Sequence, residues 1–156
     1  NKNIHHVYCN RGVSGIDGCT STAIGYAMLS SKETILISGD LSAQYDIGAL
    51  AIPNIPNTFK MIVINNGGGG IFKFIKSTSV LDEVDDYFVT KSNLPLSDLA
   101  KGFGFNFYSA NNEESLSRVL PSFLEKATKP SILEITTQYD ISANILTNYF
   151  KLNNKL

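Results

Sequence analysis

The sequence predicts an α/β domain built on an open, mostly parallel sheet of about five to six strands with helices on both faces. Short runs of apolar, often β-branched residues recur along the chain, and segments of helix-like composition lie between them. Runs that are apolar throughout are typical of strands buried on both faces, as in a parallel sheet. The alternation of strand and helix therefore indicates this fold class.

The expected elements follow one another from the amino-terminal end. The expected strands are residues 7–9, 34–38, 61–64, 105–108 and 132–136, and the expected helices are residues 16–30, 42–52, 96–103, 113–127 and 141–150. Residues 67–93 interrupt the alternation with a glycine run and an acidic cluster. A loop of that length in a compact domain is usually functional or mobile. Because no repeat or linker divides the chain, we expect residues 1–156 to form a single domain.

The composition argues against several classes of protein. The 13 Lys and Arg residues balance 14 Asp and Glu residues, whereas nucleic-acid binding usually requires a basic excess. No apolar run approaches the roughly 18–20 residues that span a bilayer, and the first residues lack the features of a signal peptide. Cys9 and Cys19 have no CxxC partners, so we interpret them as small buried side chains in a reducing compartment. A cytoplasmic protein is expected.

Three of the expected strands end in polar loops, at residues 10–12, 39–42 and 65–68. If the strands are parallel, these loops lie at one edge of the sheet, where the ligands of open α/β sheets bind. Glycine-rich loops and helix N-termini present N–H groups without internal partners and therefore favour anions. This edge is a candidate phosphate site.

The common nucleotide and hydrolase motifs do not fit these loops. The glycine run at residues 67–70 does not continue as GxxxxGK[ST], and no strand–helix turn carries GxGxxG. Residues 12–16 approach the GxSxG nucleophile elbow, but Ile16 replaces the last glycine, and both histidines precede Ser14 in the chain. A hydrolase is therefore disfavoured.

Asp40 and Asn66 indicate a divalent cation. Each follows an expected strand, and 25 residues separate them, about the length of one helix plus one strand. Hard divalent cations take oxygen ligands and usually retain phosphate oxygens and water. A carboxylate, an amide oxygen and a carbonyl from the glycine turn would supply the protein's share. The pattern leaves an alternative open, in which residues 39–40 are an ordinary turn and helix cap and Asn66 is a turn residue.

Taken together, the three loops resemble the thiamin diphosphate-dependent enzymes. Residues 10–18 (NRGVSGIDG), 39–43 (GDLSA) with Tyr45 and Asp46, and 65–72 (NNGGGGIF) stand in the order found in the C-terminal diphosphate-binding domain of one branch, the synthases of menaquinone biosynthesis. The resemblance covers about residues 7–72. It departs from the family at Gly67, where a polar residue is usual, and by the absence of a proline that the family often carries just after this region. The resemblance implies the thiamin diphosphate-binding fold.

The resemblance also implies a metal and cofactor site. Asp40, the Asn66 side chain and the Gly68 carbonyl would hold Mg²⁺ or Mn²⁺ against the diphosphate of thiamin diphosphate. Ile16 would be the apolar support that bends the cofactor. The residues implied to contact the cofactor are Ser14, Gly15, Ile16, Gly39, Asp40, Leu41, Ser42, Asn66 and Gly68.

Three further residues are implied to face the substrate. Arg11 would clamp a substrate carboxylate in bidentate fashion. Ile71 and Phe72 would line an apolar wall that favours decarboxylation, because loss of CO₂ neutralises charge. As an alternative, Ile16 and Phe72 could belong to the ordinary core and Arg11 to a surface ion pair.

The implied enzyme is a transferase that decarboxylates 2-oxoglutarate and adds the resulting carbanion to isochorismate. In this family a glutamate from the N-terminal pyrimidine-binding domain of a second subunit activates the cofactor. We therefore expect the chain to be a C-terminal fragment of a homo-oligomeric enzyme, inactive by itself. Two alternatives stay open: another thiamin diphosphate-dependent 2-oxoacid decarboxylase or carboligase, and a non-catalytic α/β module that binds phosphate.

Overall fold

A computed structural model describes residues 6–10, 12–73 and 75–153 of the chain. In chain order the elements are α1 (Cys19–Leu29), β1 (Thr34–Gly39), α2 (Asp40–Tyr45), η1 (Ile47–Ala51), β2 (Phe59–Asn65), η2 (Gly70–Lys73), α3 (Lys76–Ser79), η3 (Val84–Phe88), α4 (Leu96–Gly102), β3 (Asn106–Ala110), α5 (Glu113–Leu124), β4 (Ser131–Thr136) and α6 (Tyr139–Asn153). The elements η1 and η2 are short 3₁₀ helices, and η3 is a π-helical turn. None of the described helices is both long enough and apolar enough to cross a membrane.

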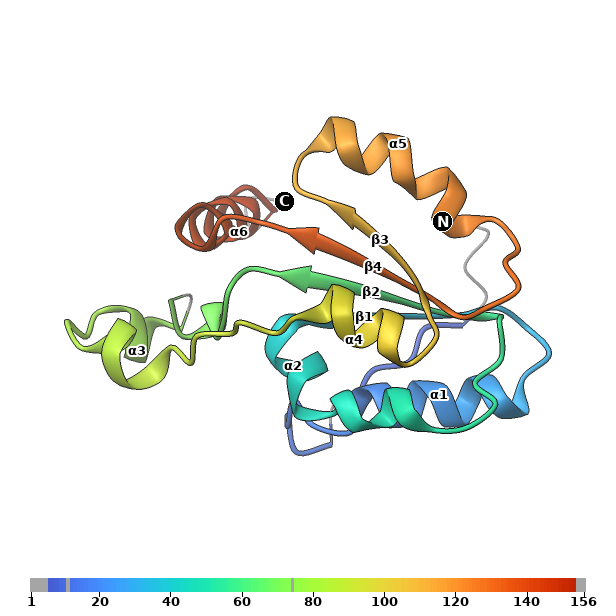
Figure 1. Cartoon of the computed structure of the whole chain (residues 1–156). Helices are drawn as coiled ribbons and strands as arrows, with labels where there is room; N and C mark the ends of the chain where they lie inside the picture. Colours follow the sequence, from blue (N-terminus) through green and yellow to red (C-terminus); the bar gives the residue numbers. More distant parts are fainter. Residues whose placement is uncertain (1–5, 11, 74, 154–156) are drawn as a thin grey trace.

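The strands form one parallel sheet in the order β1-β2-β4-β3 (Figure 1). The register places Met61 of β2 between Leu36 of β1 and Ile132 of β4, and both Met61 and Ile132 are fully buried. The central strands are apolar because helices cover the sheet on both sides of them. The predicted α/β fold with a parallel sheet is confirmed, but the described residues contain four strands and not five or six.

The expected strand at residues 7–9 does not form. Tyr8 is 72 % exposed, and its ring packs against that of Tyr26 in α1, with 5.6 Å between the ring centroids. So short a run gains few ladder hydrogen bonds, and here its aromatic side chain packs on a helix instead of joining the sheet.

Cys9 is exposed and Cys19 is half-buried, so the interpretation of both as buried side chains was wrong.

The main hydrophobic core lies on the face of the sheet covered by α1, η1 and α4 (Figure 1). Its buried members are Ile24, Ala27, Ala43, Ala49, Leu50, Phe59, Met61, Val63, Leu96, Ala100, Phe105 and Ile132. On the opposite face α5 covers β3 and β4, where Phe123 packs edge-on against Tyr108. Over β1 this second face is open, and Ile37 is 68 % exposed.

The expected helices form, although their ends differ from the prediction. Helix α2 and η1 together occupy most of the expected helix at 42–52, with the chain bending at Asp46 between them. Residues 67–93 are more ordered than the expected loop, since they contain η2, α3 and η3. These short helical turns satisfy backbone polar groups that a long irregular loop would leave to solvent.

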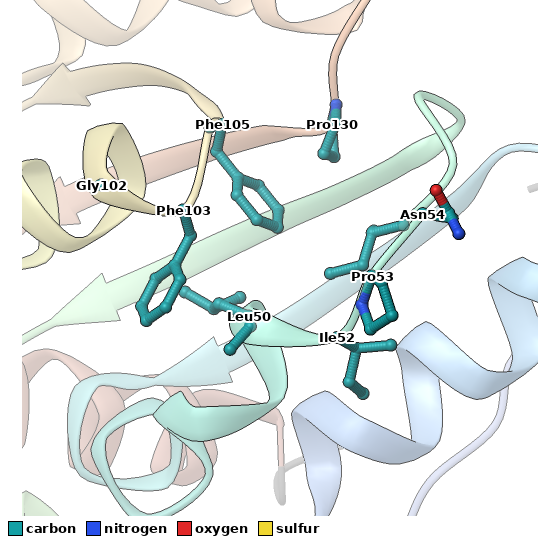
Figure 2. Close-up of a pocket in the computed structure, with 11 residues that line it drawn as sticks. Leu50, Ile52, Pro53, Asn54, Gly102, Phe103, Phe105 and Pro130 are labelled. Atoms are coloured by element: carbon teal, nitrogen blue, oxygen red, sulfur yellow. The ribbon is translucent and has the colours of Figure 1, made fainter.

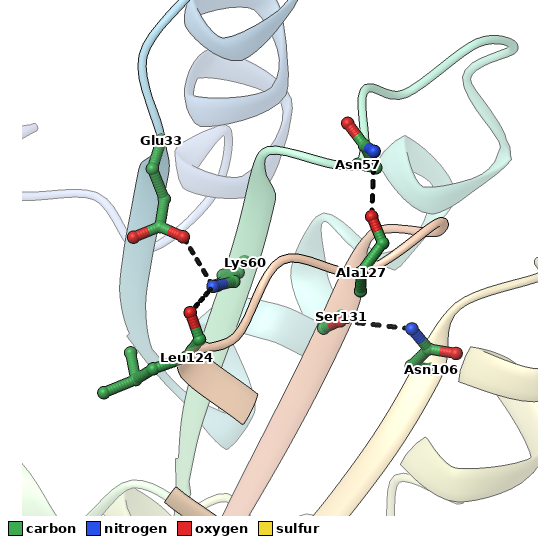
Figure 3. Close-up of polar contacts among 7 residues, drawn as sticks. All are labelled: Glu33, Asn57, Lys60, Asn106, Leu124, Ala127 and Ser131. Atoms are coloured by element: carbon green, nitrogen blue, oxygen red, sulfur yellow. Dashed lines mark hydrogen bonds and ion pairs between the residues drawn. The ribbon is translucent and has the colours of Figure 1, made fainter. Parts of the chain in front are cut away.

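Lys60 is a fully buried lysine near the start of β2 (Figure 3). Its Nζ donates to the carbonyl oxygen of Leu124 at 2.6 Å, at the end of α5, and pairs with the Glu33 carboxylate. The ammonium also lies 5.9 Å from the centroid of the Phe123 ring. The carboxyl end of a helix favours a positive charge. Lys60 therefore ties α5 to the start of the sheet, at the end opposite the polar loops.

We expect Glu33→Ala to destabilise the protein more than Lys60→Met. Without Glu33 the Lys60 ammonium stays buried and lacks a counter-charge, at a cost of about 2 kcal/mol after allowance for solvent screening of the carboxylate. Lys60→Met removes the buried charge, and the Glu33 side chain, already 46 % exposed, becomes hydrated, so the cost is below about 1.5 kcal/mol. Free energies of unfolding in urea measure both. Equal costs would contradict this account.

Candidate functional site

The candidate site lies where β1 and β2 end. Gly39 is the last residue of β1, Asp40 begins α2, and Asn66 directly follows β2. The parallel register aligns Gly39 with Ile64, so the two strand ends lie side by side. The fold thus brings together Asp40 and Asn66, which are separated by 25 residues in the sequence.

Asp40, Asn66 and Gly68 converge on one point. One terminal atom of the Asn66 amide lies 3.2 Å from Oδ1 of Asp40 and 2.7 Å from the Gly68 carbonyl oxygen. Both neighbours accept hydrogen bonds, so an amide nitrogen at this position donates to each. An amide oxygen at the same position would create a cluster of three oxygens, which a cation between them would stabilise.

One oxygen of the buried Asp40 carboxylate has no hydrogen-bond partner in the described part of the chain. Asp40 is only 3 % exposed, and its Oδ2 has no hydrogen-bond partner among the described residues. Burial raises the pKa of the Asp40 carboxyl above its ordinary value, although nearby backbone N–H groups of α2 and of the glycine turn oppose part of the rise. A buried charge of this kind is costly unless another charge compensates it.

The donor set fits Mg²⁺ or Mn²⁺. One carboxylate, one amide and one backbone carbonyl are hard oxygen ligands, and they leave room in an octahedral shell for phosphate oxygens and water. The described residues contain no group of three or more His, Cys, Asp or Glu side chains placed to hold a metal. The unpartnered Oδ2 of Asp40 and the convergence on the Asn66 amide are the observations that favour a cation at this point.

The glycine turn is held by the chain that returns to it. Gly69 N–H donates to the carbonyl oxygen of Thr90 at 3.0 Å, and Ser92 N–H donates to that of Gly67 at 3.1 Å. Gly68, with φ +145°, forms an antiparallel bridge to Lys91, and a Cβ at Gly68 would collide with the Thr90 carbonyl oxygen. Glycine is therefore required at position 68, whose carbonyl oxygen faces the Asn66 amide.

The loop before α1 is tied to α2. The Ser42 hydroxyl donates to the carbonyl oxygen of Ile16 at 2.6 Å. Oδ2 of Asp46 accepts from the N–H and the hydroxyl of Ser21, at 2.6 and 2.9 Å, and so caps the first turn of α1. Ser14, in this loop, has φ +58°, which is uncommon for a residue other than glycine. The bond from Ser42 places Ile16 beside the beginning of α2.

The expected substrate-facing residues have different surroundings. Ile71 is 59 % exposed, whereas Phe72 is half-buried and its ring lies 5.9 Å from that of Phe88. Both belong to η2, directly after the glycine turn. Leu41 lies next to the turn, since its Cδ1 would contact a Cβ at Gly69. The position of Arg11 lies outside the described residues.

The supporting contacts of three residues near the site were not predicted from the sequence. Asp46 caps a helix that begins 27 residues earlier, Asn65 binds across the sheet to Glu134, and Ser92 donates to Oε1 of Gln44 at 3.2 Å. Only the doubled asparagine at 65–66 could have indicated one of these contacts from the sequence. The other contacts depend on which segments lie side by side in the fold.

A pocket of about 420 Å³ lies at the opposite end of the sheet (Figure 2). Its lining includes Leu50, Pro53, Phe103, Phe105 and Pro130, and the last two directly precede β3 and β4. None of the described residues that line it carries a charge. A pocket whose described lining carries no charge does not suit a diphosphate, so the candidate site remains at the carboxyl ends of β1 and β2.

Comparison with known proteins identifies the type of domain. The family described as thiamine pyrophosphate enzyme, C-terminal TPP binding domain, matches residues 2–135. The chain is similar to the 2-succinyl-5-enolpyruvyl-6-hydroxy-3-cyclohexene-1-carboxylate synthases of Flavobacterium psychrophilum, at 46 % identity over 145 residues, and Christiangramia forsetii, at 40 % over 144 residues. These matches cover 93 % and 92 % of this chain but 26 % and 25 % of the two synthases.

A solved structure shows the same fold. The thiamine diphosphate-dependent 4-hydroxybenzoylformate decarboxylase of Rhodococcus jostii RHA1 matches with a TM-score of 0.62 and 24 % sequence identity. The match covers 74 % of this chain and 22 % of the decarboxylase. The chain spans about a quarter of the length of the curated synthases it matches. With its parallel sheet and the family match over residues 2–135, the chain belongs to the C-terminal TPP-binding domains of thiamine pyrophosphate enzymes.

Proposed function

We propose that this chain binds the diphosphate of thiamin diphosphate through Mg²⁺ or Mn²⁺, as the single C-terminal domain of a longer enzyme. The observation that carries the proposal is the convergence of Asp40, Asn66 and the Gly68 carbonyl on one point, with a buried Asp40 oxygen that lacks a partner. The family match supports the identity of the cofactor.

In this proposal each ligand has a separate task. The Asp40 carboxylate supplies negative charge, the Asn66 amide turns its oxygen toward the cation, and the Gly68 carbonyl completes the protein's share. The buried position of Asp40 strengthens its attraction to the cation, because water screens the charge less. A divalent cation held by these three residues would offset part of the negative charge of the diphosphate, whereas the described lining of the pocket in Figure 2 carries no charge that could do so.

Other residues around the turn bind and orient. Gly39, Leu41 and Ser42 surround Asp40 and would contact the cofactor, as would Ser14 and Gly15 of the neighbouring loop. The Ser42 hydroxyl donates its one hydrogen to the Ile16 carbonyl oxygen, so it would hold Ile16 in place, and toward a ligand it could only accept a hydrogen bond.

We further propose that the enzyme decarboxylates 2-oxoglutarate and joins the remaining four-carbon unit to isochorismate, the reaction in menaquinone biosynthesis that the resemblance implies. Thiamin diphosphate supplies the electron sink for decarboxylation when it is bound. Ile71 and Phe72 would exclude water from the departing carboxylate, and Arg11 would hold a carboxylate of the substrate. The similarity to two synthases of this name supports this choice of substrates.

The proposal requires a partner. An N-terminal pyrimidine-binding domain of a second subunit would supply the carboxylate that activates the cofactor. The enzyme would therefore be a homo-oligomer, and this chain alone would be inactive. We place the enzyme in the cytoplasm. The relatives are about four times as long as the matched region, which leaves room for such a domain in them.

Calorimetry tests the binding proposal directly. We expect the intact protein to bind thiamin diphosphate only when Mg²⁺ or Mn²⁺ is present, and to bind ATP and NAD at least about 100-fold more weakly, because the site provides cation ligands but no nucleotide motif. Equal binding of ATP would indicate a general phosphate-binding module.

A second assay tests the substrates. CO₂ release from 2-oxoglutarate is measured in the intact protein with and without isochorismate. Formation of the coupled product only when both acids are present supports the synthase. Decarboxylation of other 2-oxoacids at equal rates would point to a different decarboxylase or carboligase.

A further inference from the structure

A second pair of side chains lies directly behind the candidate cation ligands. Asn65 ends β2, and its Nδ2 donates to Oε1 of Glu134 on β4 at 2.7 Å. Its Oδ1 accepts from the N–H of Gly67 at 3.1 Å. Asn65 therefore links the sheet to the first residue of the glycine turn.

The Glu134 carboxylate decides which way the Asn65 amide faces. An ionised carboxylate only accepts hydrogen bonds, so Asn65 presents its NH₂ group to Glu134 and its oxygen to Gly67. The neighbouring Asn66 differs, because the acceptors at one end of its amide are Oδ1 of Asp40 and the Gly68 carbonyl oxygen, which are themselves the candidate cation ligands. Glu134 therefore fixes the orientation of the Asn65 amide, whereas the Asn66 amide faces groups that would bind the cation.

The locked amide matters for the turn that follows it. Gly67 has φ +82° and Gly68 φ +145°, and glycine has little intrinsic preference among such conformations. On its outer side the turn is held by Ser92, whose N–H donates to the Gly67 carbonyl at 3.1 Å. On its inner side it is held by Asn65. The Gly68 carbonyl oxygen also accepts from the N–H of Gly70 at 2.8 Å. Without the inner bond, the direction of this carbonyl would depend on that local bond and on the contacts of the turn with residues 90–92.

We propose that Glu134 and Asn65 are positioning residues for the cation site. Through the Gly67 N–H they hold the Gly68 carbonyl toward Asp40 and Asn66, and this raises the affinity for the cation. The inference rests on the proposed function, since it assumes that a cation binds these ligands. Groups that orient metal ligands in this way typically change metal affinity by about 10- to 100-fold when they are removed.

The test measures cation binding in the intact protein and in three variants: Glu134→Leu, Glu134→Gln and Asn65→Ala. Mg²⁺ is titrated calorimetrically at saturating thiamin diphosphate, and Mn²⁺ alone is followed by its electron paramagnetic resonance signal. We expect Glu134→Leu and Asn65→Ala to weaken binding by about 10-fold or more. Glu134→Gln keeps an oxygen that accepts from Asn65, so its affinity should stay within about threefold of the unaltered protein.

Glu33→Ala is the matched control. It also removes a carboxylate that accepts from a side chain of β2, but at the opposite end of the sheet. It should lower stability and leave cation affinity unchanged. A Glu134→Leu protein with unaltered affinity, or a Glu134→Gln protein as weak as Glu134→Leu, overturns the positioning role. An equal loss of affinity in Glu33→Ala does so too, because general destabilisation would then explain the effect.

The outcomes separate the two proposals. If the unaltered protein binds neither Mg²⁺ with thiamin diphosphate nor Mn²⁺ alone, the proposed function fails and the positioning role falls with it. If the unaltered protein binds and all three variants bind equally well, only the positioning role fails. Should Glu134→Leu not fold, Asn65→Ala decides the question, because it breaks the same link while the half-buried Glu134 carboxylate remains open to hydration.

Discussion

Asp40→Asn is expected to abolish cation-dependent binding of thiamin diphosphate, lowering the affinity by at least about 100-fold, or about 2.7 kcal/mol. The substitution keeps the size of the side chain and an oxygen that can accept from the Asn66 amide, but it removes the negative charge that attracts the cation. Because Asp40 is only 3 % exposed, water compensates little of that loss. Calorimetric titration of thiamin diphosphate with and without Mg²⁺ measures the change.

The same substitution should have the opposite effect on the stability of the cation-free protein. Burial raises the pKa of the Asp40 carboxyl, so this group binds a proton more readily in the folded protein than in the unfolded chain. The stability that this protonation contributes is fully present below the pKa of the unfolded chain. That contribution is lost as pH rises through the higher pKa of the folded state. At neutral pH the ionised Asp40 therefore costs stability, and Asp40→Asn should unfold at an equal or higher urea concentration when Mg²⁺ is absent. Addition of Mg²⁺ and thiamin diphosphate should stabilise the unaltered protein but not the Asp40→Asn variant.

Asp46→Asn provides the control for Asp40→Asn. Asp46 lies at the other end of α2 and accepts from Ser21, and asparagine keeps an accepting oxygen there. Its cofactor affinity should stay near that of the unaltered protein. Loss of affinity in both variants, or in neither, would contradict the assignment of the cation to Asp40.

Gly68→Ala is expected to disrupt both the turn and the cation site. A Cβ at this position collides with the backbone carbonyl oxygen of Thr90, and φ +145° is strained for any residue with a side chain. The chain must move, which breaks the bond from Gly69 N–H to Thr90 and turns the Gly68 carbonyl away. We expect a loss of at least about 3 kcal/mol in the free energy of unfolding. Cofactor binding should become undetectable.

Two other glycines separate the causes of this effect. Gly67 has φ +82° but nothing within 4 Å of a Cβ, so Gly67→Ala should show the strain alone, about 1–2 kcal/mol. Gly25 lies within α1 with open space around it, and Gly25→Ala should stabilise the protein by up to about 1 kcal/mol. Urea unfolding of the three variants gives the comparison. If Gly68→Ala is no worse than Gly67→Ala, the contact with Thr90 does not hold the turn.

Periodicity located most of the sheet because its signal is local. The strands at 34–39, 59–65, 106–110 and 131–136 are apolar runs, and each of them was expected within a few residues of its observed ends. The run at 7–9 failed because a strand also needs a partner edge, and Tyr8 packs on α1 instead. The strand order β1-β2-β4-β3 likewise cannot be predicted from the residues of any single strand.

By itself, the sequence determined the alternation of strands and helices, the polar residues at the strand ends, and the resemblance of the motifs at 10–18, 39–43 and 65–72. These depend on residue type and spacing along the chain. Only the tertiary structure decided that Thr90 lies against Gly68 and that Glu134 holds Asn65. Those contacts join segments 22 and 69 residues apart, and their geometry follows from strand order and loop path, which local residue patterns do not encode.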